Sequence, residues 1–321
     1  MVSEQVDCTV VIVTYNSARD VAGLLRSLPA AADGLTLRTV VVDNGSTDAT
    51  TGIVRSFPGV ICIEAGANLG YAGGINVGRE QAGDGPALLA LNPDVVLEAG
   101  ALREMMTALN DPGVGIVAPM LLDAEKHVCL SLRRDPSLSR AIADGILGRR
   151  VSRRPGWLSE IVRDEALYQR PRAVAWAVGA ALLISASCDR AVGPWDERFF
   201  LYSEETDYAA RARACGFRIE YLPTARAYHR GGGSGRSSAL LSLNAVNRIR
   251  YMEKRGSYPR AYRAAVILHE LLRSHDRGHR TALRWVIRRS RWPALLGDLR
   301  YPATVPAPTT EEMTTCRNSP S

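Results

Sequence analysis

The chain has 321 residues, of which 46% are hydrophobic, and it carries a formal net charge of +7. This length and composition suit one large α/β domain with an appendage, or two domains, and exclude a chain too polar to fold around a core. The six cysteines form no CxxC pair, which argues against a zinc site or a disulfide framework and favours a reducing cytoplasm.

Charge and hydropathy are unevenly distributed along the chain. Residues 226–300 hold 17 Lys and Arg and 4 Asp and Glu, a balance of +13, which leaves −6 on the rest. The N-terminus has no basic leader, and the longest apolar stretch, 174–186, covers about 13 residues, where a spanning helix needs roughly 20. We therefore expect a cytoplasmic protein with neither a signal peptide nor a transmembrane helix.

Strand-like and helix-like segments alternate over the first 120 residues. Apolar spacing predicts a helix over Asp20–Leu28 with Ser17 as its N-cap, and a second helix capped by Thr47 or Asp48 that runs through Phe57. Continuous apolar runs predict buried strands at Thr9–Val13, Thr39–Val42, Val60–Ile63 and Leu88–Leu91. This alternation is typical of a parallel sheet covered on both faces, which binds ligands beyond the carboxyl ends of its strands.

The second half of the chain is less regular. Residues 131–172 are rich in arginine and proline and predict a long connection with a helix or two. A strand over Ala173–Ser185, a helix over Thr206–Cys215 ended by Gly216, a short strand at Ile219–Leu222 and a loop at His229–Ser234 are expected next. A basic helical extension over 236–300 and a disordered tail over 301–321 complete the prediction.

Polar residues follow three of the predicted strands. They are Thr14-Tyr15-Asn16, Asp43-Asn44 and Asn92-Pro93-Asp94. A carboxylate at Asp94 suits Mg²⁺ or Mn²⁺, and one at Asp43 suits a base or ribose, although either residue can serve simply to form a turn.

Three other features carry possible chemistry. The glycines of 66–78 precede a helical run. They would either let a ligand approach the backbone closely or simply form a tight loop without a ligand. Glu204, Glu205 and Asp207 lie beside aromatic residues, where a raised pKa suits a general base, although acidic residues are also common in the first turn of a helix. His229 is either a metal ligand or one more lone histidine.

The order of these segments is more informative than any one of them. The series TVVIVTYNS, VVDNGSTD, GANLGYAGGINVG, LNPDV, VGAALLI, WDERFFLYSEETDYAARARACGFRI and HRGGGS resembles the family 2 inverting glycosyltransferases, and most closely their bacterial rhamnosyltransferase-like branch. The resemblance covers about residues 8–235. It implies a GT-A fold, with a mainly parallel central sheet flanked by helices. Residues 1–120 would be the nucleotide-sugar half and 121–235 the acceptor half of a catalytic domain 1–235.

The resemblance also implies roles for individual residues. Asp94 and His229 would hold the Mg²⁺ or Mn²⁺, with Asn92 in place of the first Asp of the family's DxD motif. Glu205 would be the catalytic base, but the family usually has Asp there, so Glu204 or Asp207 could take the role instead. The nucleotide would be bordered by Thr14, Tyr15, Asn16, Asp43, Asn68, Gly70, Asn76 and Asn92, and the acceptor by Trp176, Gly179, Trp195 and Asp196.

The expected reaction is a metal-assisted single displacement from a dTDP- or UDP-linked sugar, with rhamnose favoured, to a hydroxyl of a glycan or polyprenyl-linked acceptor. Leucines, tryptophans and arginines interleave over 238–300, which predicts either peripheral contact with the anionic inner face of the cell membrane or a solvated helical cap. The alternatives are a non-catalytic nucleotide-sugar-binding protein and a nucleotidyltransferase. Nucleic acid is not an expected partner, because the chain holds no recognised nucleic-acid motif.

Overall fold

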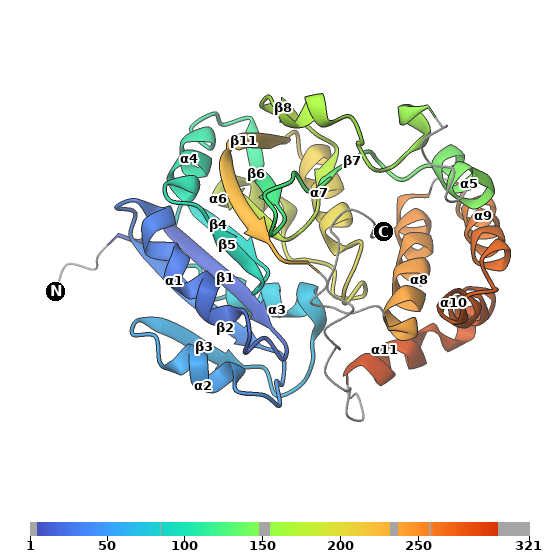
Figure 1. Cartoon of the computed structure of the whole chain (residues 1–321), viewed down its shortest axis with the longest axis horizontal. Coiled ribbons are helices and arrows are strands. Elements are labelled where there is room, and N and C mark those ends of the chain that lie inside the picture. The colour runs from blue at the N-terminus through green and yellow to red at the C-terminus, as the bar shows by residue number, and fades with distance from the viewer. Residues whose placement is uncertain (1–4, 84, 148–154, 232–236, 257, 301–321) are drawn as a thin grey trace.

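The computed structural model describes residues 5–83, 85–147, 155–231, 237–256 and 258–300 (Figure 1). Its strands are β1 Cys8–Thr14, β2 Leu37–Asp43, β3 Val60–Glu64, β4 Ala87–Leu91, β5 Val95–Leu97, β6 Val114–Leu122, β7 Leu132–Arg133, β8 Arg172–Ala173, β9 Trp176–Ala177, β10 Ala181–Ser185 and β11 Arg218–His229. Its helices are α1 Val21–Ala32, α2 Thr50–Arg55, α3 Gly70–Arg79, α4 Ala101–Ala108, α5 Leu138–Leu147, α6 Ala186–Val192, α7 Glu204–Ala214, α8 Ser238–Arg255, α9 Pro259–Leu272, α10 Arg277–Ile287 and α11 Trp292–Arg300.

A nine-stranded sheet forms the centre of the fold, in the order β3-β2-β1-β4-β10-β6-β11-β5, with β8 paired to β11. The pairings make β1, β2, β3, β4, β6 and β11 run in one direction and β5, β8 and β10 against it. The prediction of a mainly parallel sheet is therefore confirmed. The carboxyl ends of β1 and β2 meet in register, Thr14 opposite Asp43.

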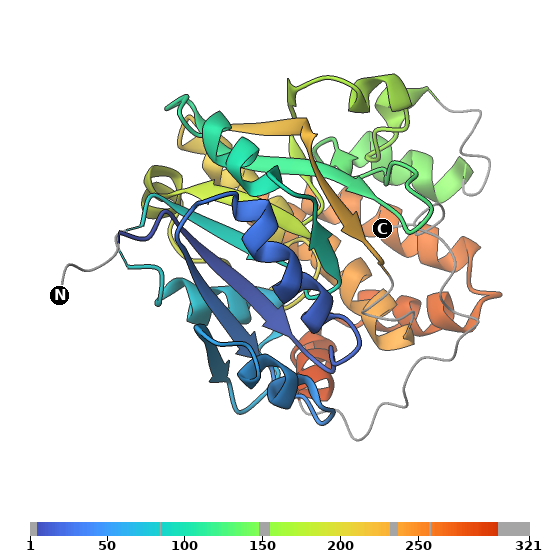
Figure 2. The ribbon, with the colours of Figure 1, turned by 60° about the vertical axis from the view of Figure 1, so that its left-hand side comes forward.

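Helices cover both faces of this sheet (Figures 1 and 2). Helices α1 and α4 bury their apolar sides on one face. Helices α3, α6 and α7 pack on the other. Every residue of β1 and β4 is buried, which explains why these strands are mostly apolar and supports the predicted α/β class.

Several local predictions were wrong. Ser17 does not cap α1, because Asp20 holds that position and no side chain caps the helix. The strand expected over 173–185 is broken into β8, β9 and β10, and β5 and β6 were not predicted at all. Strand β11 is far longer than Ile219–Leu222 and ends at His229, so this histidine lies on a strand and not in a loop.

Most of the glycine-rich segment 66–78 is itself helix α3, which begins at Gly70; only residues 66–69 precede it. A Cβ on Gly78 would lie 2.2 Å from Cγ1 of Val11, and one on Gly74 would lie 2.6 Å from Cγ1 of Val13. These glycines let α3 approach β1 closely, so helix–sheet packing accounts for them. The helix of the acidic cluster also begins earlier than predicted, at Glu204.

The predicted helical extension is confirmed by α8, α9, α10 and α11. Together with α5 they surround a hydrophobic cluster that also contains Phe199, Phe200 and Ala210 of the region around α7. Within the described ranges, no helix combines the length and hydrophobicity that a membrane span requires. The expected tail at 301–321, part of the arginine-rich connection and Gly232–Ser234 lie outside the described residues.

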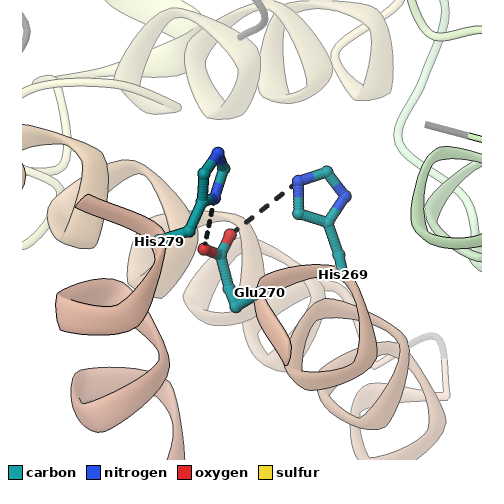
Figure 3. Close-up of side chains that lie close together, drawn as sticks. All are labelled: His269, Glu270 and His279. Carbon is teal, nitrogen blue, oxygen red and sulfur yellow. Dashed lines mark hydrogen bonds and ion pairs between the residues drawn. The ribbon is translucent and has the colours of Figure 1, made fainter. Parts of the chain in front are cut away.

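A buried polar group joins two helices of the extension (Figure 3). Nδ1 of His279 on α10 lies 2.8 Å from Oε2 of Glu270 on α9, and Nε2 of His269 lies 3.9 Å from Oε1 of the same carboxylate. Burial, followed by the nearby positive charges of Arg248 and Arg273, lowers the pKa of His269 to about 3. Because these arginines oppose a bound cation, we interpret the group as an interhelical contact.

Candidate active site

The ends of β1 and β2 are joined by a buried hydrogen-bonded carboxylate. Asp43, 1% exposed, accepts hydrogen bonds from Oγ1 of Thr14 at 2.8 Å, from the backbone N–H of Ser46 at 2.8 Å and from Oγ of Ser46 at 2.5 Å. A carboxylate with these bonds is held in one orientation at the carboxyl edge of the sheet. This is where an α/β sheet binds its ligand.

Asn16 fixes the loop that follows β2. Its backbone adopts a left-handed conformation with φ of 49°, which asparagine tolerates better than most residues. Its Oδ1 accepts the backbone N–H of Thr47 at 2.8 Å, and its own N–H donates to Oγ of Ser46 at 2.8 Å. Neighbouring Tyr15 is only partly buried. The loops after β1 and β2 therefore form one ordered surface.

The predicted metal residues lie next to each other. Sheet pairing sets His229, the last residue of β11, opposite Val95 of β5, the residue after Asp94. Nε2 of His229 lies 3.3 Å from Oδ1 of Asp94, and both side chains are largely buried. Burial opposes ionisation of Asp94, but the hydrogen bond and charge of His229, with smaller contributions such as that of Arg230, outweigh it and lower the pKa of Asp94.

Two charged residues beside Asp94 were not predicted. Arg230 donates its backbone N–H to the carbonyl of Asp94 at 3.1 Å, and its guanidinium forms an ion pair with Asp20 before α1. Burial raises the pKa of Asp20, and repulsion from Asp94 adds to this effect, whereas the pairing with Arg230 opposes it. In the sequence, the only feature that could have marked Arg230 as a site residue was its position next to His229.

The turn after β4 also reaches β10. Asn92 donates its backbone N–H to the carbonyl of Ala180 at 2.9 Å, and its own carbonyl accepts the N–H of Val95 at 3.4 Å. The Asn92-Pro93-Asp94 turn is thereby fixed between strand β4 and the segment that contains Gly179.

The three carboxylates at the start of α7 have different environments. Asp207 is fully buried and forms ion pairs with Arg211 at 2.8 Å and Lys254 at 2.7 Å. Glu204 is 3% exposed, whereas Glu205 is only partly buried. The buried Oε2 atoms of Glu204 and Glu205 have no hydrogen-bond partner among the described residues. Burial raises the pKa of both glutamates, and the charge of Glu205 raises that of Glu204 further.

Tyr71, on the first turn of α3, connects the two groups of carboxylates. Its hydroxyl donates to the carbonyl of Gly179 at 2.9 Å. Burial raises the pKa of Tyr71, and the negative charges of Glu204, Glu205 and Asp94 add to this effect, as expected if all three lie near its ring. A Cβ at Gly179 would lie 3.4 Å from Cβ of Glu205, so the glycine leaves room for this glutamate. Tyr71 was not predicted to be a site residue. The one feature that could have indicated it is that it is the only aromatic residue in the glycine-rich segment 66–78.

The predicted acceptor tryptophans are buried. Trp195 is 2% exposed and stacks on Tyr208 with ring centroids 4.5 Å apart. Asn76 binds the backbone of Trp195 twice, at 2.8 and 2.9 Å. Trp176 is buried as well and donates Nε1 to the carbonyl of Arg134. These side chains are therefore positioned to support the walls of a site, while direct contact with a ligand would need them to move.

Asp196 lies at the surface beside these aromatic residues. Hydrogen bonds from Arg198 and Lys254 lower its pKa strongly. An open depression of about 540 Å³ is lined by Asn76, Val192, Pro194, Trp195, Asp196, Glu197, Arg198, Arg211 and Lys254. Neither Asp94 nor Glu205 contributes to that lining, so we do not assign the depression to the reaction centre.

A mostly parallel α/β sheet flanked by helices, with polar strand ends next to a carboxylate-bearing helix, has the architecture of a GT-A glycosyltransferase. The family model for glycosyl transferase family 2 matches residues 9–130. The chain is 33% identical, over 72% of its length and 78% of the relative's, to the N-acetylglucosaminyl-diphospho-decaprenol L-rhamnosyltransferase of Mycobacterium tuberculosis. It is 24% identical to rhamnosyltransferase WbbL of Escherichia coli, over 77% of this chain and 92% of that one.

The chain therefore belongs to glycosyl transferase family 2, as a rhamnosyltransferase-like member that uses a nucleotide-sugar donor. Among solved structures, the mannosyltransferase PcManGT from Pyrobaculum calidifontis, in complex with GDP-Man and Mn²⁺, has a similar fold. It matches with a TM-score of 0.52 at 17% identity, over 92% of this chain and 79% of that one.

Proposed function

We propose that this enzyme transfers rhamnose from a dTDP- or UDP-linked donor to a hydroxyl of a glycan or polyprenyl-linked acceptor, with inversion at the anomeric carbon. The observation that carries the proposal is that the Asp94–His229 pair and Glu205 meet the same short segment. The turn that contains Asp94 is bonded to Ala180, and Glu205 lies beside the neighbouring Gly179. The sugar donor is inferred from relatives whose names specify rhamnosyltransferases.

The nucleotide would lie along the carboxyl edge of the sheet, bordered by Thr14, Tyr15, Asn16, Asp43 and Asn92. Asp43 would accept hydrogen bonds from the base or ribose. Because it is 1% exposed, this contact requires its partner Ser46 to move aside. Asn68 and Gly70 would lie at the start of α3, where Oδ1 of Asn68 accepts the N–H of Gly70 at 3.0 Å. We assign this donor role to residues 1–120 and the acceptor role to residues 121–235, and we assign Asn76, Trp176, Trp195 and Asp196 to the framework around it.

Asp94 and His229 fit a divalent cation, because they offer an oxygen and a nitrogen 3.3 Å apart at a largely buried edge. The mixed donor set suits Mn²⁺ better than Mg²⁺, which prefers oxygen ligands. A metal bound there would stabilise negative charge on the departing diphosphate. A metal would take the place of the hydrogen bond between the two side chains, with Asp94 ionised and His229 neutral.

Glu205 would accept the proton of the acceptor hydroxyl. Asp207 is the poorest candidate, because two cations neutralise it and it is fully buried. Glu204 is almost inaccessible, whereas Glu205 remains partly exposed beside Gly179. A raised pKa makes Glu205 a stronger base than an ordinary carboxylate.

The test is a transfer assay with a panel of nucleotide sugars, in the presence of Mg²⁺ or Mn²⁺. Asp94→Ala and addition of a chelator should abolish transfer, and Glu205→Gln should do so while Glu204→Gln and Asp207→Asn retain part of it. Full activity of Asp94→Ala, or a loss restricted to the position 204 or 207 variants, would refute these assignments. No turnover with any donor would favour the non-catalytic binding protein, and release of pyrophosphate instead of nucleoside diphosphate would favour a nucleotidyltransferase.

A second proposal concerns the extension, which we infer to contact anionic lipid at the inner face of the membrane. Large apolar side chains are exposed on α9 and α10 and on α5, which packs against α9. They are Leu268, Leu271, Leu272, Ile287, Ile142 and Ile146. Exposed arginines on and beside α10 would complement anionic headgroups. Liposome flotation of Leu271→Asp/Leu272→Asp against wild type tests this, and equal binding by both would reject it.

A further inference from the structure

The loop that leads into α7 has an unusual backbone. Phe200, Tyr202 and Ser203 all have positive φ, of 65°, 71° and 68°, although none is glycine. Residues of this kind persist only where their surroundings impose the conformation, and they concentrate at functional sites. The next two residues are Glu204 and Glu205, so the path of this loop determines where both carboxylates lie.

One side chain of the extension binds this loop at three points. Asn247 of α8 is fully buried, and its Nδ2 lies 2.5 Å from the carbonyl oxygen of Phe199, 2.9 Å from that of Leu201 and 3.1 Å from that of Tyr202. Its Oδ1 accepts a hydrogen bond from Arg250 at 3.1 Å, which fixes the orientation of the amide. No other side chain among the described residues bonds to three carbonyls of this loop.

The remaining carbonyl of the loop is held from the opposite side. The N–H of Tyr71 donates to the carbonyl of Phe200 at 2.7 Å. A Cβ on Gly70 would lie only 2.3 Å from that oxygen, so the glycine permits the approach. The loop is thus fixed between α3, which carries Tyr71, and α8, which carries Asn247.

We propose that Asn247 is a positioning residue for transfer, which acts by holding the Phe199–Ser203 loop so that Glu205 lies beside Gly179. The inference rests on the proposed role of Glu205. It goes beyond a packing role because, within the described residues, every hydrogen bond of this side chain goes to a backbone carbonyl of the loop or to its neighbour Arg250. Arg250 and Lys254, one and two turns further along α8, add contacts to Arg198 and Asp207 on the same side.

The experiment compares the full chain with Asn247→Asp, which keeps the size of the side chain but removes its N–H donors. Misplacing a catalytic group by about 1 Å can cost on the order of a hundred-fold in rate, so kcat should fall by about that factor. The affinity for the nucleoside diphosphate with Mn²⁺, measured by calorimetry, should stay within about two-fold of wild type, because the donor residues are not touched. Asn247→Ser retains one donor, so its kcat should lie between those of the wild type and Asn247→Asp. This variant also keeps the inference testable if Asn247→Asp does not fold.

The matched control is Ser242→Ala. Ser242 is also fully buried on α8, but its hydroxyl bonds only to the carbonyl of Ser238 in the same helix. This variant should keep the wild-type kcat. A wild-type kcat in Asn247→Asp, or an equal loss of kcat and nucleotide affinity, would overturn the inference.

A readout independent of turnover separates this inference from the proposed function. Arg198 is exposed before the loop, and its carbonyl is held by Arg250. Tryptic cleavage after Arg198 should be faster in Asn247→Asp than in wild type and in Ser242→Ala. If the wild type transfers no sugar, the proposed function fails. If cleavage after Arg198 is equally fast in Asn247→Asp and in the wild type, the positioning role of Asn247 is rejected, whatever the outcome of the transfer assay.

Discussion

Gly78 packs directly against the central strand β1, and replacing it with alanine tests how closely α3 must approach the sheet. The new Cβ would lie 2.2 Å from Cγ1 of Val11, whereas carbon atoms pack at about 3.7 Å. Val11 is fully buried, and its branched side chain has little rotamer freedom. The helix and strand must therefore separate by about 1.5 Å to relieve the contact.

The expected effect is the difference between two opposing contributions. Overpacking of this kind costs about 2 kcal/mol, and alanine in place of glycine inside a helix stabilises by about 1 kcal/mol. Gly78→Ala should therefore lower the free energy of unfolding by about 1 kcal/mol and the Tm by about 2 °C. Gly52→Ala in α2 is the control, because nothing lies within 4 Å of its Cβ position, and its Tm should rise.

Urea and thermal denaturation of both variants measure the difference. If Gly78→Ala were as stable as the wild type, close packing would not explain the glycines of α3. A transfer assay adds a second check, because the same helix carries Tyr71 at its first turn. A displaced α3 should slow transfer in Gly78→Ala and leave Gly52→Ala unaffected.

Three further predictions concern charged groups. Burial, and then the charge of Glu205, raises the pKa of Glu204, so the folded protein takes up a proton before the unfolded chain does and gains stability on acidification. Glu204→Gln should raise the Tm at neutral pH and weaken this gain, and an unchanged Tm profile would contradict it. Burial raises the pKa of Glu205 above its ordinary 4.5, so kcat/KM should fall as the pH drops through that raised value, and Glu205→Gln should lack this acidic limb. Lys254→Met leaves the buried carboxylate of Asp207 with Arg211 as its ion-pair partner and should lower the free energy of unfolding by about 3 kcal/mol, measured in urea.

The strands of the first half of the chain were predictable because their signals are local. Each strand from β1 to β4 is a continuous apolar run that ends in polar residues, and these ends meet because parallel strands share one edge. The close approach of His229 to Asp94 depended on a resemblance, since β5 and β11 are distant in sequence. Strands β5 and β6 were missed since a three-residue strand carries little pattern, and a buried apolar run such as β6 gives no periodicity to separate strand from helix.

The region around α7 and α8 was predicted less well because its contacts are long-range and involve backbone groups. Nothing in the sequence around Asn247 distinguishes it from an ordinary helical asparagine, and its three partners are about 45 residues away. Positive φ at Phe200 and Tyr202 contradicts the local preference of aromatic residues, so no local rule could have suggested it. Indole burial at Trp176 and Trp195 likewise became visible only with the tertiary structure.

The hydrophobic cluster shared by Phe199, Phe200 and the C-terminal helices has a consequence for how this enzyme can be recombined. A chimera joined at residue 235 would combine the loop and both phenylalanines with a foreign α8 that did not evolve to pack on them. A junction between the donor-side strands and β6 would instead keep α7, its loop and α8 together. We expect acceptor preference to be exchangeable between relatives only as that single block, and donor preference to be exchangeable without it.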